Sequence, residues 1–479
     1  MKFLSTRTGI EATGPETVFQ GLAPDGGLFL PLLETPITTV QPSTSDLQPP
    51  TLTLRDAERF VCERLFGDFP ESVREEAINR LCSRFPAEDP IPLVEKDGLH
   101  FLELFHGKTG AFKDVALSML PVFMRYAAKG KRVLILTATS GDTGSAAMQG
   151  FAGVEGTEII VFYPATGTSR VQKLQMTTPS EANVHAVGIR GNFDDAQAAV
   201  KRIFASKAMN DAAAAAGVTL SSANSINTGR LIPQIAYYLL AGAKLGGFDV
   251  VVPSGNFGNI LAAYYAKKLG APIRKLVVAS NVNDVLARFV KTGVYEPGAK
   301  FTVTNSPSMD IRISSNVERL LWMLNYDGDV AAACAETSRL MQDLKERGRY
   351  ELNDAAKARL FADFEGGVAT PEETEAEMRR LRERCGYLVD PHTAVASFVA
   401  KKLGYSAVQP STSDLQPLPP CVIAATATPY KFPETCLRAY GEDVLTAPPA
   451  AFAELERLPI AQTQVCDIDE IDAAVSALF

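Results

Sequence analysis

The sequence contains the stretch Val250-Val-Val-Pro-Ser-Gly-Asn-Phe-Gly-Asn259, which has the order of a buried strand, a glycine turn and the start of a helix. A second stretch, Val133-Leu-Ile-Leu-Thr-Ala-Thr-Ser-Gly-Asp-Thr-Gly-Ser-Ala146, repeats that order. Short, fully apolar strands followed by helices are typical of parallel sheets covered on both faces. The two stretches therefore predict an α/β fold, with functional loops at the carboxyl ends of its strands.

Similar patterns extend this prediction along the chain. Strands are expected at 133–136, 159–163, 184–189, 250–252, 276–279 and 421–424, and helices at 194–206, 231–243 and 282–290 and from about 144 and 259. Residues 52–95 are mostly helix-periodic and predict a small N-terminal unit. The charged, helix-periodic stretch 343–384 predicts a solvated helical face.

The composition is that of a folded globular protein. The chain has 479 residues, of which 46% are hydrophobic and 21% charged, close to the usual averages. Its net charge of −8 disfavours nucleic-acid binding, and no apolar run approaches the roughly 18 residues of a membrane span. The seven cysteines form no CxxC pair and no apolar segment marks a secretory signal, so we expect a cytoplasmic protein with reduced thiols. The four histidines are too dispersed to predict a metal site.

One decapeptide, VQPSTSDLQP, occurs twice, at residues 40–49 and 408–417. Its Pro, Ser and Asp content is typical of exposed loops. We therefore predict two surface loops without a chemical role.

Two glycine loops share the pattern S-G-x-x-G, at residues 140–144 and 254–258. Glycines let successive backbone N–H groups face one point, and the following helix N-terminus adds partial positive charge. Two such loops predict two anion sites, or a cofactor phosphate and a substrate carboxylate; the alternative is a pair of tight turns. Neither loop matches a dinucleotide fingerprint or a P-loop, which argues against a nucleotide-binding module.

Lys113 stands in Phe105-His-Gly-Lys-Thr-Gly-Ala-Phe-Lys-Asp114, where a helix is expected to begin. The helix N-terminus and partial burial both favour the neutral amine, which is the form that reacts with a carbonyl. The alternative is a surface lysine, but its place just before an anion loop favours the functional interpretation.

In this order, the motifs resemble the threonine synthase family, pyridoxal-phosphate (PLP) enzymes of fold type II (tryptophan synthase β-like), in its longer form with an N-terminal domain. Other stretches that carry the resemblance are 21–31, 224–230, 315–319, 390–395 and 424–432. The resemblance implies an N-terminal domain at 1–95 and a catalytic region at 96–479, with a smaller subdomain of roughly 112–225 inserted in the larger one.

The resemblance also implies site residues. Lys113 would carry the cofactor and shuttle protons, residues 254–259 would cradle its phosphate, Thr426 would bond the pyridine nitrogen, and the 140–145 loop would hold the substrate carboxylate. The implied cofactor residues are Lys113, Asp142, Ser254, Gly255, Asn256, Phe257, Gly258, Asn259 and Thr426. The implied substrate residues are Ser140, Gly141, Thr143, Ser145, Asn227, Ser315, Asn316 and Arg319. The candidates for a substrate-phosphate clamp are Lys108, Arg230, Arg312 and Arg319.

The implied activity is a carbon–oxygen lyase reaction at the last step of threonine biosynthesis. O-phospho-L-homoserine and water would give L-threonine and phosphate by γ-elimination and β-addition of water, in a monomer or homodimer. Alternatives are another fold-type-II lyase, such as a serine/threonine dehydratase, and a non-catalytic homologue that binds PLP. The chain departs from the family pattern at Lys108 and Thr428, where many members have proline and histidine.

Some polar side chains leave two interpretations open. The amides of Asn224 and Asn227 would either line the pocket or cap a helix near Arg230. His106 and His392 would either carry protons or hold structure by hydrogen bonds, and we favour the structural role, with His392 at a helix start.

Overall fold

The computed structural model describes residues 1–33, 52–298, 301–405 and 419–479. Both copies of the duplicated decapeptide lie outside the described residues. Among the helices of the described part, none has the length and apolar character needed to cross a bilayer.

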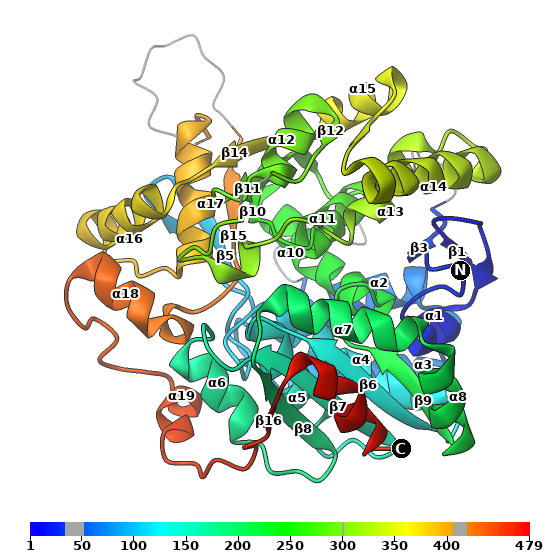
Figure 1. Cartoon of the computed structure of the whole chain (residues 1–479). Coiled ribbons are helices and arrows are strands. Elements are labelled where there is room, and N and C mark those ends of the chain that lie inside the picture. The colour runs from blue at the N-terminus through cyan, green and yellow to red at the C-terminus, as the bar shows by residue number, and fades with distance from the viewer. Residues whose placement is uncertain (34–51, 299–300, 406–418) are drawn as a thin grey trace.

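Two sheets organise the molecule, one above the other in Figure 1. The larger sheet has the order β14 (Phe364–Val368), β11 (Ile273–Ser280), β10 (Phe248–Pro253), β15 (Cys421–Ala425), β5 (Leu99–Glu103) and β4 (Leu93–Lys96). Its neighbours are parallel except for the edge strand β4. The smaller sheet is parallel, with the order β16 (Val465–Cys466), β8 (Val184–Ile189), β7 (Thr157–Pro164), β6 (Arg132–Ala138) and β9 (Val218–Ser222). The α/β class with parallel sheets is confirmed.

Alternating side chains of these strands enter different cores. Val250 and Val252 of β10 belong to the central core, whereas Val251 faces a second core on the other side of the larger sheet. Ile135 of β6 also faces the central core, whereas Leu134 faces a third core behind the smaller sheet. The central core therefore joins the inner faces of both sheets, and helices cover both faces, as parallel sheets require.

The helices are arranged around these cores (Figure 1). Those named below are α1 (Gly14–Gln20), α2 (Leu54–Leu65), α3 (Glu71–Cys82), α4 (Lys113–Ala128), α5 (Asp142–Phe151), α6 (Arg170–Thr177), α7 (Phe193–Ala205), α9 (Thr228–Leu231), α10 (Ile235–Leu245), α11 (Gly258–Lys268), α12 (Val285–Thr292), α13 (Val317–Asn325), α17 (Pro391–Lys402) and α18 (Pro433–Tyr440). The others are α8 (Lys207–Ala215), α14 (Val330–Arg347), α15 (Asp354–Asp363), α16 (Pro371–Cys385), α19 (Ala450–Leu455) and α20 (Ile471–Ser476).

The six expected strands are all present, as β6, β7, β8, β10, β11 and β15. The helices expected after them are also present, as α5, α7, α10, α11 and α12. The helical prediction for 343–384 is wrong in two parts, because the short strand β13 (Tyr350–Glu351) and strand β14 interrupt it. Strand β14 joins the larger sheet. Phe364 and Gly366 of β14 are buried, so this segment is not a solvated face.

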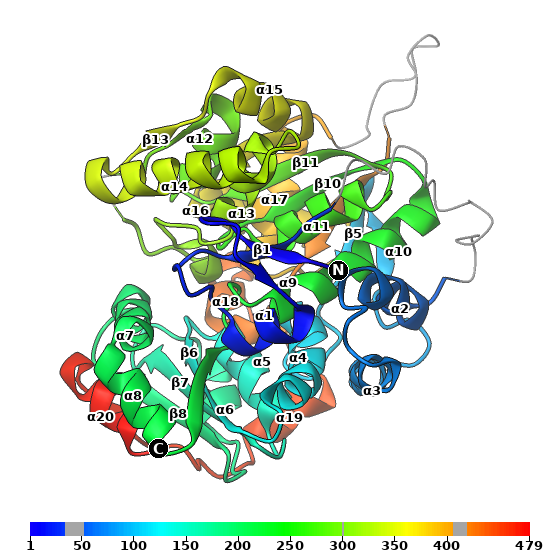
Figure 2. The ribbon, with the colours of Figure 1, turned by 90° about the vertical axis from the view of Figure 1, so that its right-hand side faces the viewer.

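The N-terminal residues form a unit beside the two sheets (Figure 2). Its antiparallel sheet has the order β2 (Glu11–Ala12), β1 (Phe3–Ser5) and β3 (Phe29–Pro31). The helical prediction for 52–95 is confirmed by α2 and α3, except that β4 follows them. A further antiparallel pair joins β12 (Val294–Tyr295) and β13 (Tyr350–Glu351). The division into domains at residue 95 stays a prediction.

Candidate active site

A cavity lies where the carboxyl ends of β6, β10 and β15 meet the beginnings of α4, α5 and α11. Its walls include these residues from the sequence prediction: Lys113, Ser140, Asp142, Thr143, Ser254, Gly255, Asn256, Phe257, Gly258, Asn259 and Thr426. Strands from both sheets therefore deliver the expected groups to one place, as the carboxyl-end rule anticipates.

Lys113 is the first residue of α4, and its side chain enters the cavity. Its Nζ donates to Asp142 Oδ2 at 3.1 Å. Burial lowers the pKa of Lys113, and the nearby charges of Arg230 and Lys431 lower it further, whereas Asp142 opposes them. The net direction is downward, which favours the neutral amine that carbonyl chemistry needs.

Asp142 begins α5 and is buried among cations. Its Oδ1 accepts from Gln172 Nε2 at 2.8 Å and lies 3.2 Å from Lys431 Nζ. Burial alone would raise the pKa of this carboxyl, but Lys113, Lys431 and His392 hold it well below its usual range. The carboxylate is therefore ionised and contacts both lysines.

The 140–144 loop is shaped by a buried hydroxyl. Thr139 Oγ1 accepts from the backbone N–H groups of Gly141 at 2.9 Å and Gly144 at 3.0 Å. Gly141 has φ 147°, and a Cβ there would lie 2.4 Å from the Gln172 side chain. The loop requires glycine at this position, because a side chain would collide with the group that holds Asp142.

The 254–259 loop forms a cradle at the N-terminus of α11. Phe257 has a left-handed backbone with φ 62°, which turns the chain just before the helix. A Cβ on Gly255 would lie 2.3 Å from the Ser308 carbonyl oxygen, so the loop and the facing wall are in close contact. Asn259 Oδ1 accepts from the Tyr238 hydroxyl, whereas its buried Nδ2 has no partner among the described residues.

These groups fit pyridoxal phosphate. Lys113 offers an amine for its aldehyde, and the cradle with the unpaired Asn259 amide suits its phosphate. Thr426 places a hydroxyl in the cavity at the end of β15, where it would meet the ring nitrogen. The Thr426 carbonyl also accepts from the Phe112 N–H at 2.9 Å and thereby holds the residue before Lys113.

Arg230 is the buried cation that lines the cavity beside Lys113. Its Nη1 donates to the Ala223 carbonyl at 2.6 Å, and its Nε has no partner among the described residues. Burial lowers the pKa of Arg230 to about 10, with a small opposing effect of Tyr237. A guanidinium with an unpaired nitrogen is a ready partner for an anion.

The other cations considered for the clamp lie elsewhere. Lys108 is exposed, and Arg312 donates to the Gly298 carbonyl at 3.1 Å near the surface. Arg319 is fully buried outside the cavity wall, where it donates to the carbonyls of Phe29 at 2.6 Å and Ile226 at 2.5 Å. These contacts tie segments of the fold together.

The remaining predicted substrate residues do not line the cavity: Gly141, Ser145, Asn227, Ser315, Asn316 and Arg319. Asn227 caps α9, since its Oδ1 accepts from the Gly229 N–H at 2.9 Å. Asn224, by contrast, lines the cavity, so each of the two amides follows one of the expected alternatives. Ser315 contacts the cradle through a bond to Asn256 Oδ1 at 3.2 Å. Their roles in substrate binding stay predictions.

Some site residues make contacts that the sequence did not predict. His392 lines the cavity at the start of α17, where its Nε2 accepts from the Ser308 N–H at 3.1 Å. Its Nδ1 lies 2.8 Å from Asp390 Oδ1, which fixes the ring and favours a proton on Nδ1. His392 was expected at a helix start, but its contact with the Ser308 wall joins segments far apart in sequence. Gln172 and Lys431 were missed for the same reason.

The two departures from the family pattern lie outside the cavity wall. Thr428 donates its N–H to the Gly110 carbonyl at 3.0 Å, and its methyl carbon would lie 2.6 Å from a Cβ at Gly110. Lys108 is exposed on the loop that contains Gly110. His106 also lies outside the wall and pairs with Glu103 Oε2 at 2.7 Å. Within the described residues, no group of three or more His, Cys, Asp or Glu side chains could hold a metal ion.

The chain resembles known proteins in sequence and structure. Residues 86–362 match the family described as "Pyridoxal-phosphate dependent enzyme". The threonine synthase of Saccharomyces cerevisiae is 37% identical over 81% of this chain and 80% of its own length. That of Pseudomonas aeruginosa is 36% identical over 95% of this chain and 93% of its own length. The crystal structure of PLP-bound threonine synthase from Brucella melitensis has a TM-score of 0.83 and 34% identity, covering 100% of this chain and 99% of that one. The chain belongs to the threonine synthase family of pyridoxal-phosphate-dependent enzymes.

Proposed function

We propose that the chain converts O-phospho-L-homoserine and water into L-threonine and inorganic phosphate. The observation that carries this proposal is one cavity holding the Lys113 amine, 3.1 Å from Asp142, with two glycine loops around it. Beside the amine lies the Arg230 guanidinium, whose Nε has no partner among the described residues. An amine, a cofactor cradle and a separate cation are what a PLP enzyme acting on a phosphorylated amino acid requires.

The reaction balances with few groups. One proton leaves Cα and one leaves Cβ, the Cγ–O bond breaks, and phosphate departs with the bonding electrons. Cγ then gains a proton, water adds its hydroxyl to Cβ, its remaining proton goes to phosphate, and Cα regains a proton. PLP, when bound, supplies the conjugated system that stabilises negative charge on the substrate carbons.

The residues of this chain supply position and proton carriers. Lys113 lines the cavity, and burial lowers the pKa of its amine, which favours the neutral form that can take up and return a proton. Asp142 holds that amine in place without removing it from the cavity. We propose that the 140–145 loop binds the substrate carboxylate through the backbone N–H groups of its cavity-lining residues Ser140, Asp142 and Thr143, because those of Gly141 and Gly144 are bonded to Thr139. This contact would also keep Cα next to Lys113.

Arg230 is the cation we propose for the substrate phosphate. It is buried, and its Nε has no partner within the described part of the chain. A buried guanidinium binds phosphate strongly because water competes little there. It would also stabilise the charge on the departing phosphate.

The test is to incubate the PLP-loaded protein with O-phospho-L-homoserine and to measure phosphate and threonine together. We expect equal amounts of the two products, and neither from Lys113→Ala. Phosphate with a keto acid in place of threonine would contradict the proposal and indicate an eliminating lyase, the serine/threonine dehydratase class. Absence of both products from the loaded protein would favour a binding protein.

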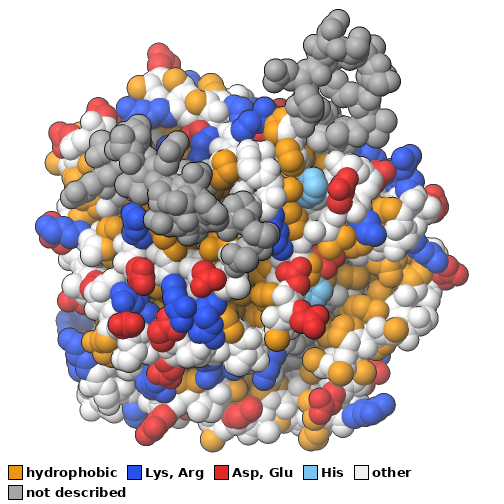
Figure 3. Space-filling view, turned by 180° about the vertical axis from the view of Figure 1, so that it is seen from behind, with side chains coloured by type: hydrophobic (Ala, Val, Ile, Leu, Met, Phe, Trp, Pro, Cys, Tyr) orange, Lys and Arg blue, Asp and Glu red, His pale blue; other side chains and the backbone are white. Residues whose placement is uncertain are grey.

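We also propose that the chain works in the cytoplasm as a monomer or homodimer. All seven cysteines are free in the structure, which suits a reducing compartment. Acidic and basic side chains are interspersed on the face seen in Figure 3. Size-exclusion chromatography with light scattering would give the mass of the protein in solution. A trimer or larger assembly would contradict the proposal.

A further inference from the structure

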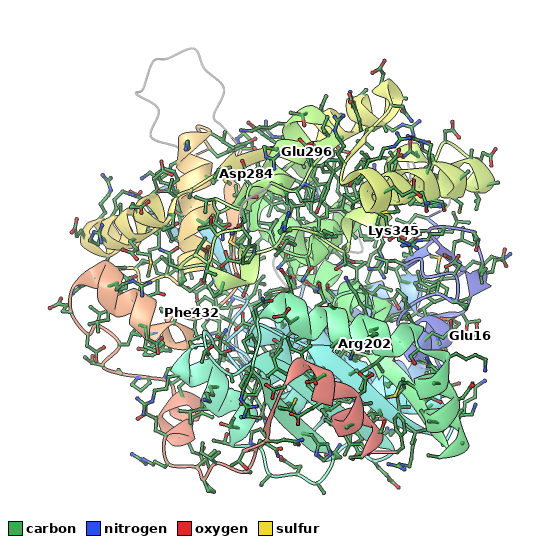
Figure 4. The ribbon with its side chains drawn as sticks, in the orientation of Figure 1. Glu16, Arg202, Asp284, Glu296, Lys345 and Phe432 are labelled. Carbon is green, nitrogen blue, oxygen red and sulfur yellow. The ribbon has the colours of Figure 1, made fainter. Side chains whose placement is uncertain are left out.

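Lys431 is a second lysine that reaches Asp142 from outside the cavity. It ends the 3₁₀ turn Pro429–Lys431 just before α18, and it is fully buried. The next residue along the chain, Phe432, lies in the region between α18 and α6 (Figure 4). Lys431 is not one of the residues that line the cavity.

The ammonium group of Lys431 makes three hydrogen bonds and one ion pair. It donates to the Thr109 carbonyl at 2.8 Å and to Gln175 Oε1 at 2.9 Å, and it lies 3.2 Å from Asp142 Oδ1. The Ser145 hydroxyl is more distant, at 3.4 Å. Three segments therefore converge on this side chain: the loop before Lys113, helix α5 and helix α6.

The two oxygens of Asp142 are divided between the two lysines. Oδ2 accepts from Lys113 at 3.1 Å, and Oδ1 faces Lys431 at 3.2 Å. With one negative and two positive charges, this buried group of three carries an excess proton. Release of that proton leaves a neutral set, and Lys113 is the member that faces the cavity.

We propose that Lys431 is a positioning residue of the active site, which engages one oxygen of Asp142 so that this carboxylate orients Lys113 without retaining its proton. The proposal rests on the proposed function, because it takes Lys113 as the lysine that captures the cofactor.

The surrounding charges agree with this role. The charged groups that act on Lys113 are Asp142, Arg230 and Lys431, and burial is the largest effect on its pKa. His392 acts on Asp142 from α17. Asp114, next to Lys113 on α4, has its carboxyl bonded to Thr109. Burial raises the pKa of Asp114, and the Thr109 bond and Lys431 offset only part of that rise. Asp142 is the carboxylate that contacts both lysines.

The experiment uses the full-length protein from which the cofactor has been removed. Absorbance measures the rate at which it captures pyridoxal phosphate covalently, between about pH 6 and 10, and the midpoint is the pH at which this rate is half its maximum. The capture rate reports the fraction of neutral Lys113. We expect Lys431→Gln, which keeps hydrogen bonding but loses the charge, to move the midpoint upward by about one pH unit or more. Lys431→Arg, which keeps the charge, should stay within about half a unit of the wild type. Asp142→Asn should move the midpoint downward, because both lysines lose their counter-ion.

Thermal unfolding checks that each variant is folded. If Lys431→Gln does not fold, Gln175→Glu serves instead, because a new carboxylate 2.9 Å from Lys431 weakens its hold on Asp142. We expect the same upward shift from that variant. An unchanged midpoint in a folded Lys431→Gln or Gln175→Glu protein would overturn the proposal, as would equal shifts for Lys431→Gln and Lys431→Arg. Absence of capture by the wild type would instead contradict the proposed function itself.

Discussion

Among the described residues, the guanidinium of Arg230 donates one hydrogen bond, from Nη1 to the Ala223 carbonyl, and its Nε has no partner. An unpaired buried cation destabilises a fold unless a ligand satisfies it. Lys113 differs, because Asp142 already holds it. At the residue scale, we propose that these two cations have different roles: Lys113 exchanges protons, and Arg230 binds the substrate phosphate.

We expect Arg230→Gln to lower kcat/KM for O-phospho-L-homoserine by about tenfold to a hundredfold, the effect of one or two charge-assisted hydrogen bonds. Bound PLP, measured by absorbance, should change little. Lys108→Gln is the matched control, because Lys108 is exposed outside the cavity, and its kcat/KM should stay within about twofold. A large loss for Lys108→Gln with none for Arg230→Gln would reverse the assignment.

At the scale of elements, the sequence predicts those strands and loops that a local pattern of residues determines. Strand β8 is bounded correctly because Val184–Ile189 is almost entirely apolar and buried. Strand β14 was missed because Phe364-Glu-Gly-Gly-Val368 contains two glycines and a carboxylate, which break an apolar run. The glycine loops were found because backbone geometry demands glycine. The contacts of Lys431 and His392 were not, because no local spacing links them to Asp142 and Ser308.

Helix α2 carries a carboxylate that packs into the central core. Glu58 is fully buried, and both its oxygens lack a hydrogen-bond partner among the described residues. Burial raises the pKa of Glu58 well above its ordinary value of 4.5, so the folded protein favours the protonated acid. Protonated Glu58 therefore contributes to the stability of the folded state. This contribution is fully present below about pH 4.5 and is lost as the pH rises through the raised pKa of Glu58 in the folded protein.

We expect Glu58→Gln to stabilise the protein increasingly as the pH rises from about 5 to 8, by up to about 1.4 kcal/mol per pH unit. Thermal unfolding of both proteins across this range measures the difference, in which the other titrating groups cancel. A difference in Tm that is constant with pH would contradict the prediction.

At the scale of the whole molecule, the N-terminal unit holds the segment that carries Arg230. Asn227 Nδ2 donates to the Val18 carbonyl of α1 at 2.8 Å, and the hydroxyls of Thr17 and Thr228 lie 2.7 Å apart. Arg319 joins the same segment to β3, where its donors meet backbone carbonyls. The N-terminal unit therefore supports one wall of the cavity, as Figure 2 shows for α1 beside α9.

We expect Arg319→Met to lower the free energy of unfolding by about 2–4 kcal/mol, because it leaves buried carbonyls unpaired. Denaturant unfolding measures the loss, and Arg312→Met is the control, since Arg312 lies near the surface. Unchanged stability with a large rise in KM would instead support a direct role of Arg319 in substrate binding.

We propose that Lys113, and not the nearby Lys431, carries the cofactor and the chemistry. The most direct test reduces the PLP-loaded protein with borohydride and maps the labelled peptide by mass spectrometry. We predict one adduct, on Lys113, with turnover lost in proportion to labelling. An adduct on Lys431, or labelling of Lys113 that leaves turnover intact, would contradict the account.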